Sequence, residues 1–308
     1  MNFTLLSRCS YREAALHLLV VTVLGLVWLT GSTDNACGEP SSKPDPYDSL
    51  RERLIRDGFD KALIRSLYSR PGVIFDQQGL GAYFLHCEAT LNYDQFLTRS
   101  SIAPGIGYLS KYREALQQAQ EIYGVEGEVI TAIMLVESRL GAFVGKRLVL
   151  NSLSGLAALD DRANRDMLWH TWVKQKAPGS REEFDTWASR KSAWAFYELK
   201  AFLEYIEAQR LDPFSVHGSY AGALGIAQFL PSSALRFARD GNGDGQIDLC
   251  QHEDAIESVA NYLKQHGWRP GLKRREAFRI LLCYNRSTYY ADTILKVAER
   301  LSKLKAQR

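Results

Sequence analysis

The sequence predicts a mainly α-helical protein. Apolar residues recur every three to four positions through most of the chain after residue 46, which is the period of an amphipathic helix. Patterns typical of strands are confined to 73–75 and to a brief pairing around Ile247. Proline and glycine turns separate the helical stretches, and no internal repeat is visible.

The first half of the folded region contains four helical patterns before the most apolar stretch of the chain. They cover residues 47–57, 60–69, 91–98 and 108–123. Pro71-Gly72 ends the second pattern. Pro104 to Gly107 is expected to break the chain, because proline and glycine disfavour a helix interior.

The second half continues the helical pattern across longer loops. Its expected helices cover residues 160–176, 180–210, 231–239, 254–266, 275–282 and 289–303. The turn Pro178-Gly-Ser180, a glycine-rich bend at 217–225 and an Asp/Gly/Asn loop after residue 239 interrupt them.

Residues 1–33 predict a signal peptide or membrane anchor. Arg8 and Arg12 precede an apolar run at 14–30, the order found in exported proteins. A run of about seventeen residues is at the short limit for a membrane span. Residues 34–49 are rich in Pro, Ser and Asp and predict a linker. We expect export, with cleavage or retention left open; a buried hairpin helix is the alternative.

Charge and cysteine content narrow the function classes. A net charge of +3 without a basic block gives no case for nucleic acid. Cys9 lies in the leader, and export leaves four cysteines in an oxidising compartment, for which three pairings exist. Those four are Cys37, Cys87, Cys250 and Cys283. The pairing stays open.

The stretch 124–145 predicts an apolar helix that carries one carboxylate, Glu137. Met134, Ile133 and Ile130 precede it by three, four and seven positions, so it shares their face. Burial disfavours the ionised form, so we expect this carboxyl to keep its proton to higher pH than a free Glu, as a general acid requires. No second carboxylate lies on a comparably apolar face. The alternative is a structural role, either a pair with a nearby cation (Arg139, Lys146 or Arg147) or a cap on a neighbouring segment.

The loop 240–248, DGNGDGQID, predicts an EF-hand-like calcium site. Gly245 permits the sharp turn. Gln251 stands where the standard loop has a Glu, so we expect Glu253 or Asp254 to close the shell. A single loop favours a structural role; a solvated turn without metal is the alternative. The other oxygen ligands are Asp240, Asn242, Asp244 and the backbone carbonyl of Gln246.

Two further motifs carry polar groups. In 217–233, three glycines allow close backbone approach, and Ser219 and Gln228 are able to orient a water or hydroxyl; a helix-packing bend is the alternative. In 283–290, tyrosines suit the faces of sugars, and Asn285 suits their hydroxyls. The alternative there is an aromatic core position with a helix cap at Ser287.

Taken together in this order, these residues resemble the membrane-bound B type of lytic murein transglycosylases. The resemblance spans about residues 90 to 300. It is carried by Val136-Glu137-Ser138 through Gly141, Gly218 to Ser233, Asp240 to Asp248, Ser258 to Tyr262, and Tyr284 to Ser287.

The resemblance implies a lysozyme-like helical catalytic core with an EF-hand-like calcium loop and helical additions. It implies a catalytic region at 50–308, with a helical insertion at 160–195 because that segment is longer than the family requires. Glu137 would be the single acid/base that cleaves the bond between N-acetylmuramic acid and N-acetylglucosamine, forming a 1,6-anhydro ring. Sugar contacts are implied for Ser219, Gln228, Tyr262, Tyr284 and Asn285. Calcium is implied at Asp240, Asn242, Asp244, Gln246 and Asp254.

The resemblance also implies an address and partners. We expect a periplasmic monomer that binds peptidoglycan glycan strands, with cell-wall synthesis or remodelling proteins as a second class of partner. The membrane is a partner only if the N-terminal segment is uncleaved. The alternatives are a muramidase that hydrolyses the same bond, a non-catalytic peptidoglycan- or partner-binding protein of the same fold, and a calcium-regulated scaffold.

Overall fold

The computed structural model describes residues 45–307 except 86–91 and 177–178. The predicted leader, most of the predicted linker, and Cys9, Cys37 and Cys87 lie outside the described residues. Pro44–Arg308 forms one compact unit. Its first helix already begins at Asp48, and Tyr47 is buried, so the linker ends before residue 49. No helix among the described residues is long and apolar enough to cross a membrane.

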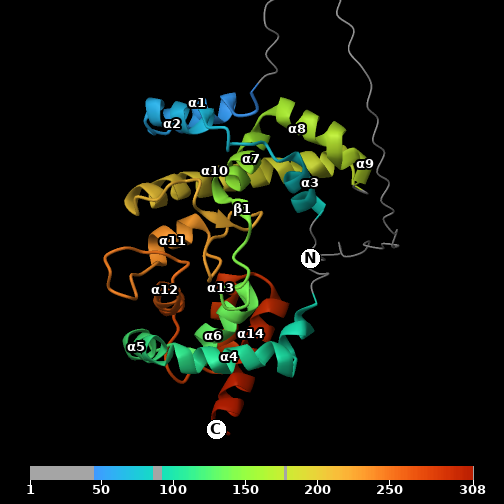
Figure 1. The fold of residues 1–308 in the computed structure, drawn as a ribbon. Coiled ribbons are helices and arrows are strands. Elements are labelled where there is room, and N and C mark those ends of the chain that lie inside the picture. Colours follow the sequence, from blue (N-terminus) through green and yellow to red (C-terminus); the bar gives the residue numbers. More distant parts are fainter. Residues whose placement is uncertain (1–44, 86–91, 177–178, 308) are drawn as a thin grey trace, which may run out of the picture. The chain divides into compact units, whose positions relative to one another are not determined.

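Helices make up most of this unit, as predicted (Figure 1). The unit also contains two short 3₁₀ helices, η2 (Tyr93–Leu97) and η3 (Ala158–Asp160), and a π-helical turn, η4 (Trp169–Val173). The helices are α1 (Asp48–Arg56), α2 (Lys61–Ser69), α3 (Gln77–Leu85), α4 (Arg99–Lys111), α5 (Arg113–Tyr123), α6 (Gly127–Ser138), α7 (Val149–Ala157), α8 (Arg162–Leu168), α9 (Lys174–Lys176), α10 (Arg181–Ala208), α11 (Pro231–Phe237), α12 (His252–Gln265), α13 (Arg274–Tyr284) and α14 (Thr288–Lys305).

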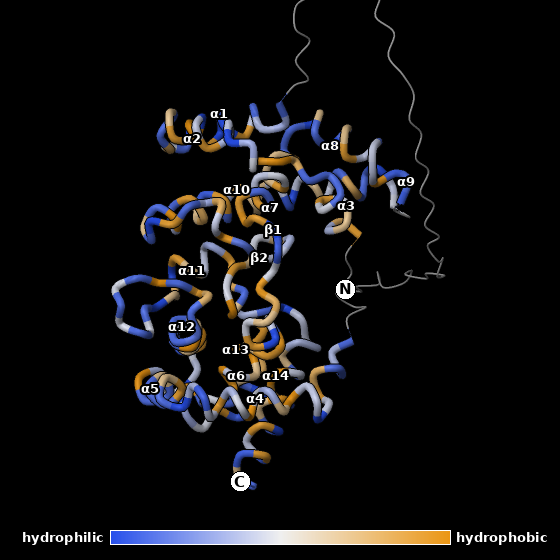
Figure 2. The backbone as a smooth tube through the Cα atoms, viewed as in Figure 1, coloured by the Kyte–Doolittle hydropathy of each residue, from blue (hydrophilic) through white to orange (hydrophobic). Residues whose placement is uncertain are grey.

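Two groups of helices share one hydrophobic core. In the first, α6 packs against α14, α4 and α5, and α5 also packs against α12. In the second, α10 packs against α7, α11 and η3, and α3 packs against α7 and η4. Hydrophilic and hydrophobic residues alternate along α1, α5 and α12 (Figure 2), as expected for helices with one face on the core.

The predicted strands are wrong. Residues 73–75 and the segment around Ile247 contain no strand, and the only paired strands among the described residues are β1 (Arg147–Leu148) and β2 (His217–Gly218). They run antiparallel, with Arg147 opposite Gly218. This short pair joins the segment after α6 to the glycine-rich bend, so it appears where two loops meet and not where a hydrophobic alternation exists.

The predicted break at 104–107 is also wrong. Helix α4 runs through Pro104, and the chain instead bends at Tyr112, between α4 and α5. Pro104 is exposed, while Ile102 and Ile106 on either side are buried. Packing of this apolar face compensates for the hydrogen bond that proline removes.

Helices α3 and α7 were not predicted. Helix α7 is buried on nearly every side, so it has no polar face to produce a helical period. Helix α3 contains Gly79 and Gly81, which lower its intrinsic propensity. A Cβ at Gly81 would lie 2.1 Å from the Trp172 ring, so glycine is required there by packing.

Candidate active site

Glu137 lies in the last turn of α6, where the helix leaves the core. Ile130, Ile133 and Met134 on the same side of the helix are fully buried, whereas Glu137 is half-buried. The predicted apolar face is therefore present, with the carboxylate at its edge. A ligand can reach the carboxylate there while the helix that carries it stays anchored in the core.

The turn after α6 holds Glu137 in place. Ser138 Oγ donates to the carbonyl of Met134 at 3.3 Å and accepts from the N–H of Gly141 at 2.9 Å. Residues 139–140 have φ values of 50° and 61°, and Gly141 follows at 90°. Residues other than glycine rarely adopt this left-handed backbone conformation. The Ser138 hydroxyl and Gly141 together stabilise this strained turn next to the carboxylate.

Two tyrosines lie near the Glu137 carboxylate, Tyr284 at the end of α13 and Tyr290 in the first turn of α14. Burial raises the pKa of both phenols well above the ordinary value, and the charge of Glu137 raises it further. Their rings are 6.2 Å apart and nearly parallel. The Tyr290 hydroxyl has no partner at good hydrogen-bond geometry among the described residues, so its polar contact with Glu137 is close but poorly aligned. Both phenols remain neutral donors at physiological pH.

Tyr290 was not selected from the sequence as a site residue. Its position follows from the start of α14, where Ser287 Oγ accepts from the Tyr290 N–H at 3.3 Å. A serine three positions before an aromatic residue is a recognisable helix cap. That signal locates Tyr290 in the first turn but does not show that this turn faces Glu137.

The predicted sugar contacts Tyr262 and Asn285 have supporting positions. Tyr262 is buried, its hydroxyl donates to the carbonyl of Cys283 at 2.7 Å, and its ring lies 4.9 Å from that of Tyr284. Burial raises the pKa of Tyr262 to about 12. Asn285 Oδ1 accepts from the N–H of Ser287 at 3.0 Å. Tyr262 therefore backs Tyr284, and Asn285 shapes the turn before α14.

The glycine-rich bend is fixed by the side chains that were expected to touch substrate. Ser219 Oγ accepts from the N–H groups of Ala221 and Ala223, at 3.2 and 3.1 Å. Gln228, at φ 50°, donates through Nε2 to the carbonyls of Val144 and Gly225, at 3.1 and 2.8 Å. Gln228 thus ties the bend to the segment after α6.

The glycine-rich bend also contacts Tyr284. Tyr284 donates its hydroxyl to the carbonyl of Ala227 at 2.6 Å. Glu137, Gln228 and Tyr284 are therefore brought into one neighbourhood, whereas Ser219 lies toward the other end of the bend, where its carbonyl accepts from Ser152 Oγ at 3.2 Å.

The structure contains a second carboxylate on an apolar face, contrary to expectation. Glu198 of α10 is 3% exposed and accepts from the N–H and the hydroxyl of Ser232 at 2.9 and 2.8 Å. Burial raises the pKa of Glu198, which these two hydrogen bonds oppose. Ser232 lies in the first turn of α11, so Glu198 serves that helix end. Charged and polar residues are interspersed along α10, so the sequence around Glu198 does not show an apolar helix face.

The loop 240–248 folds around Asp240. The Asp240 carboxylate accepts from the N–H groups of residues 243–245, at 2.7, 3.2 and 2.7 Å. Asp244 Oδ1 accepts from the N–H of Gln246 at 2.8 Å, and Asn242 Nδ2 donates to Asp244 Oδ2 at 3.1 Å. Asp240 is half-buried, and Asn242 and Asp244 are exposed. Their side chains supply oxygen ligands in the order that a calcium loop requires.

Asp254 lies beneath this loop and is fully buried. Its Oδ1 accepts from the N–H of Gly241 at 2.9 Å, and its Oδ2 from the N–H of Asp248 at 2.7 Å. Burial raises the pKa of Asp254. No three His, Cys, Asp or Glu side chains among the described residues converge as a metal site. The loop fits calcium by residue type and order, and Asp254 supports its backbone.

Cys250 and Cys283 are exposed free thiols and do not pair with each other. Burial within its loop, followed by the charge of Asp248, raises the pKa of Cys250 to about 11. The remaining candidate partners, Cys37 and Cys87, lie outside the described residues.

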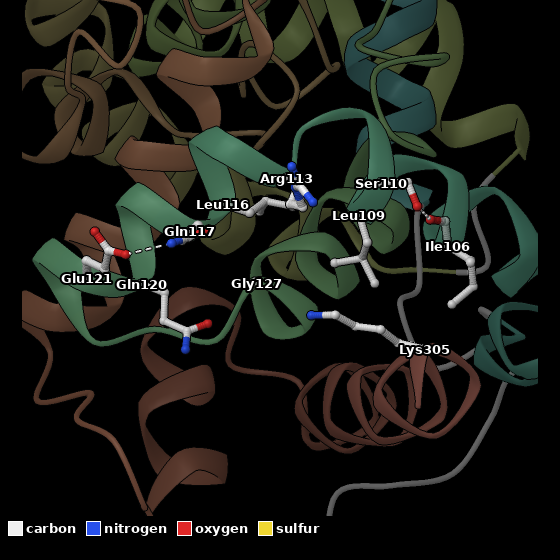
Figure 3. A pocket seen from close by; sticks show the side chains of 10 residues that line it. All are labelled: Ile106, Leu109, Ser110, Arg113, Leu116, Gln117, Gln120, Glu121, Gly127 and Lys305. Atoms are coloured by element: carbon white, nitrogen blue, oxygen red, sulfur yellow. Dashed lines mark hydrogen bonds between the residues drawn. The ribbon is translucent and has the colours of Figure 1, made fainter. Parts of the chain in front are cut away.

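A cavity of about 530 Å³ lies away from Glu137 (Figure 3). It opens between α4, α5 and Lys305 of α14, with Gly127 at the start of α6 on its wall. Glu137 comes ten positions after Gly127 in α6, which is about 15 Å along the helix. This cavity therefore lies at the end of α6 opposite Glu137.

Comparison with known proteins gives a consistent result. The family described as "Transglycosylase SLT domain" matches residues 43–277. The chain is 35% identical over 177 residues to the membrane-bound lytic murein transglycosylase B of Escherichia coli K12, covering 58% of this chain but only 41% of that relative.

Solved structures share the fold. The soluble lytic transglycosylase SltB1 of Pseudomonas aeruginosa is 25% identical with a TM-score of 0.68, over 84% of this chain and 98% of that one. Escherichia coli SLT35, in a complex with calcium, is 24% identical with a TM-score of 0.66, over 85% and 94% of the two chains. The expected helical architecture of these lysozyme-like enzymes is thereby confirmed.

Proposed function

The chain belongs to the transglycosylase SLT domain family, and from this premise we propose that it is a lytic murein transglycosylase with Glu137 as its single acid/base. The observation that carries the proposal is the position of Glu137 in the last turn of α6, half-buried and near Tyr284 and Tyr290. A general acid must be accessible and must be held in one orientation.

The reaction needs only one carboxyl group. Protonated Glu137 donates its proton to the oxygen between N-acetylmuramic acid and N-acetylglucosamine, and that bond breaks. The Glu137 carboxylate then takes the proton of the muramoyl C6 hydroxyl, whose oxygen bonds to C1 and closes the 1,6-anhydro ring. Glu137 ends protonated, as it began. The nucleophile is part of the substrate, so no second carboxylate is required, in contrast to paired-carboxylate glycosidases.

The neighbouring tyrosines support both steps. Because their pKa values are raised, Tyr284 and Tyr290 stay neutral near the carboxylate form of Glu137 and add no negative charge. Tyr290 is the proposed donor to that carboxylate, since the Tyr284 hydroxyl donates to the carbonyl of Ala227. Glu198 is not proposed as a second acid or base, since both of its carboxylate oxygens accept hydrogen bonds from Ser232. Tyr284 and Gln228 are the proposed sugar contacts nearest Glu137, with Ser219, Tyr262 and Asn285 supporting the groove.

Mass spectrometry of digested murein tests this function. We expect glycan ends one water lighter than reducing ends, and loss of release in Glu137→Gln. Glu128→Gln is the matched control, because Glu128 lies in the first turn of the same helix, at the end away from Glu137, and pairs with the exposed Lys305. Reducing ends alone would indicate the muramidase. No release by the folded wild type and by folded Glu128→Gln would indicate a non-catalytic binder.

The proposal includes a structural calcium ion on the 240–248 loop, held by Asp240, Asn242, Asp244, the Gln246 carbonyl and Asp254. Calcium would join the start and end of the loop. A ligand at 100 times its Kd stabilises a protein by about 2.7 kcal/mol, which raises the melting temperature by several degrees.

Calorimetry with calcium, magnesium and chelator tests this site. We expect calcium to raise the melting temperature of the wild type and of Asp94→Asn, an exposed carboxylate outside the loop, but not that of Asp244→Asn. A melting temperature insensitive to chelator in all three proteins would remove calcium from the account.

The proposed partner is the peptidoglycan glycan strand, and the proposed location is the periplasm. Attachment to a membrane would occur through residues 1–33 if they are uncleaved. Cell fractionation with N-terminal sequencing tests both points: a mature chain that starts before residue 14 and sediments with membranes indicates an anchor.

A further inference from the structure

Two tyrosines from separate elements meet outside the Glu137 neighbourhood. Tyr83 of α3 and Tyr220 of the glycine-rich bend have ring centroids 4.9 Å apart, tilted by 55°. Tyr220 is 38% exposed and lines a cavity of about 370 Å³. Tyr83 is half-buried and does not line that cavity. Tyr83 therefore supports one side of the Tyr220 ring, and the cavity lies on another.

The segment 160–195 holds Tyr83 in this position. Lys191 Nζ donates to the Tyr83 hydroxyl at 2.7 Å and lies over the Tyr83 and Trp194 rings. The Trp187 ring meets the Tyr83 ring edge-on at 5.8 Å. Burial, and then the charge of Arg190, lower the pKa of Lys191, in keeping with the position of its ammonium group between the Tyr83 and Trp194 rings. The helical insertion thus positions the aromatic pair.

Helix α3 is fastened to the same segment along its length. The Phe84 ring packs at 5.3 Å against Phe184 and at 5.1 Å against Trp187. Gly81 admits the Trp172 ring, as described above, and Thr171 Oγ1 donates to Gln77 Oε1 at 2.6 Å. The placement of Tyr83 therefore depends on residues 160–195 and not on α3 alone.

The cavity beside Tyr220 has the composition of a carbohydrate site. Leu80 and Leu148 give it an apolar floor, while Asp76 and Arg147 form an ion pair on its wall. Lys146 is exposed and makes no ion pair among the described residues. An aromatic face combined with a few planar polar groups binds sugar rings and their N-acetyl amides.

The cavity is connected to the Glu137 neighbourhood by the same two segments. The chain leaves α6 at Ser138 and reaches β1, and β1 pairs with β2, which ends two residues before Tyr220 (Figure 2). At Gly145 the two backbones touch, since a Cβ there would lie 2.0 Å from the Gly218 carbonyl oxygen. These two segments therefore link the cavity to the turn that follows Glu137.

We propose that Tyr220, backed by Tyr83, is a distal subsite for an N-acetylated sugar of the glycan strand, and that the 160–195 insertion builds it. The proposal rests on the proposed function, because the ligand is the strand that Glu137 would cleave. Tyr220 contacts the sugar, whereas Tyr83 and Lys191 are positioning residues. This gives the insertion a role in binding longer strands.

Isothermal titration with N-acetylglucosamine oligomers of three and six units tests the subsite in the Glu137→Gln full-length chain, which cannot consume them. We expect the hexamer to bind more tightly than the trimer. Tyr220→Ala should weaken hexamer binding about tenfold, to the level of the trimer, and leave the trimer unaffected. Tyr220→Phe should keep the parent affinity. Tyr197→Ala is the matched control, since Tyr197 is an exposed tyrosine of α10 outside the cavity.

The positioning residues have their own expected result. Lys191→Met keeps every aromatic side chain but removes the hydrogen bond that holds the Tyr83 hydroxyl, so it should weaken only the hexamer, by about threefold. Equal affinity of the parent for the two oligomers would overturn the subsite, as would Tyr220→Ala losing both equally or neither. The proposed function is judged separately, by the murein products of the wild-type chain, so a wild type that releases anhydro ends while Tyr220→Ala binds normally refutes the subsite alone.

Discussion

Replacing Glu198 by alanine should destabilise the fold through the start of α11. The carboxylate is 3% exposed and receives both the N–H and the hydroxyl of Ser232. Alanine removes both acceptors and leaves the Ser232 N–H without its partner in the first turn of the helix. An orphaned buried donor costs about 1–3 kcal/mol, and the space left by the side chain costs about 1–2 kcal/mol more.

We therefore expect Glu198→Ala to lower the free energy of unfolding by about 3 kcal/mol. Glu198→Gln separates the hydrogen bonds from the charge. Its Oε1 accepts from the Ser232 N–H, and its Nε2 donates to the Ser232 hydroxyl oxygen. Because both contacts are kept and no charge is buried, the Gln variant should lie within about 1 kcal/mol of wild type at pH 7.

The pH dependence gives a second readout. The folded-state pKa of Glu198 is raised above its unfolded value, so the folded protein binds the proton more tightly. Protonation of Glu198 therefore adds to the free energy of unfolding. This contribution grows as the pH falls through the folded-state pKa toward the ordinary value of 4.5, and it is absent at higher pH. Relative to wild type, Glu198→Gln should be most favourable at neutral pH, and the advantage should shrink on acidification.

Urea unfolding followed by circular dichroism at pH 7 and pH 5 measures both effects. Glu198→Ala unfolding within about 0.5 kcal/mol of wild type would refute the assignment of Glu198 to the α11 cap. A difference between Glu198→Gln and wild type that is the same at both pH values would refute the raised pKa.

Two further changes have sharp expectations. Gly145→Ala and Gly58→Ala place the same side chain at φ values of 102° and 101°, but only at Gly145 would the new Cβ clash, 2.0 Å from the Gly218 carbonyl oxygen. Urea unfolding should therefore show that Gly145→Ala loses about 2 kcal/mol more free energy of unfolding than Gly58→Ala. Equal losses in the two variants would contradict the contact. Tyr290→Phe removes a neutral donor beside the ionised form of Glu137, so the alkaline limb of the pH–rate profile should move to higher pH; a limb that stays in place or moves to lower pH would show that this hydroxyl does not donate to Glu137.

Much of the candidate site was visible in local sequence signals. The Val136-Glu137-Ser138 helix end was identified, and the structure explains its spacing by the Ser138 hydroxyl and the φ of Gly141. The Asp/Asn/Gly loop appears where expected, with its turn centred on Asp240. These features could be predicted because the interacting atoms are within about five residues of one another, so the residue order itself specifies the hydrogen bonds.

Contacts between distant segments were not predictable in this way. The presence of Tyr290 beside Glu137, the burial of Glu198 behind Ser232, and the backing of Tyr284 by Tyr262 depend on how whole helices pack. The glycines of α3 lowered its helical signal, yet those glycines are what admit Trp172. Likewise, Pro104 should interrupt α4 on local grounds, and the buried face around it overrides that preference.

The sequence by itself therefore determined the helical class, the helix carrying Glu137, the loop composition and the order of motifs that indicates the family. Tertiary structure alone decided which side chains face the carboxylate, which polar groups are occupied by backbone, and that residues 160–195 hold Tyr83 against Tyr220. The physical reason is range: helical period and capping act over one or two turns, whereas side-chain proximity across about 140 residues, as between Tyr83 and Tyr220, follows only from close packing of a shared core.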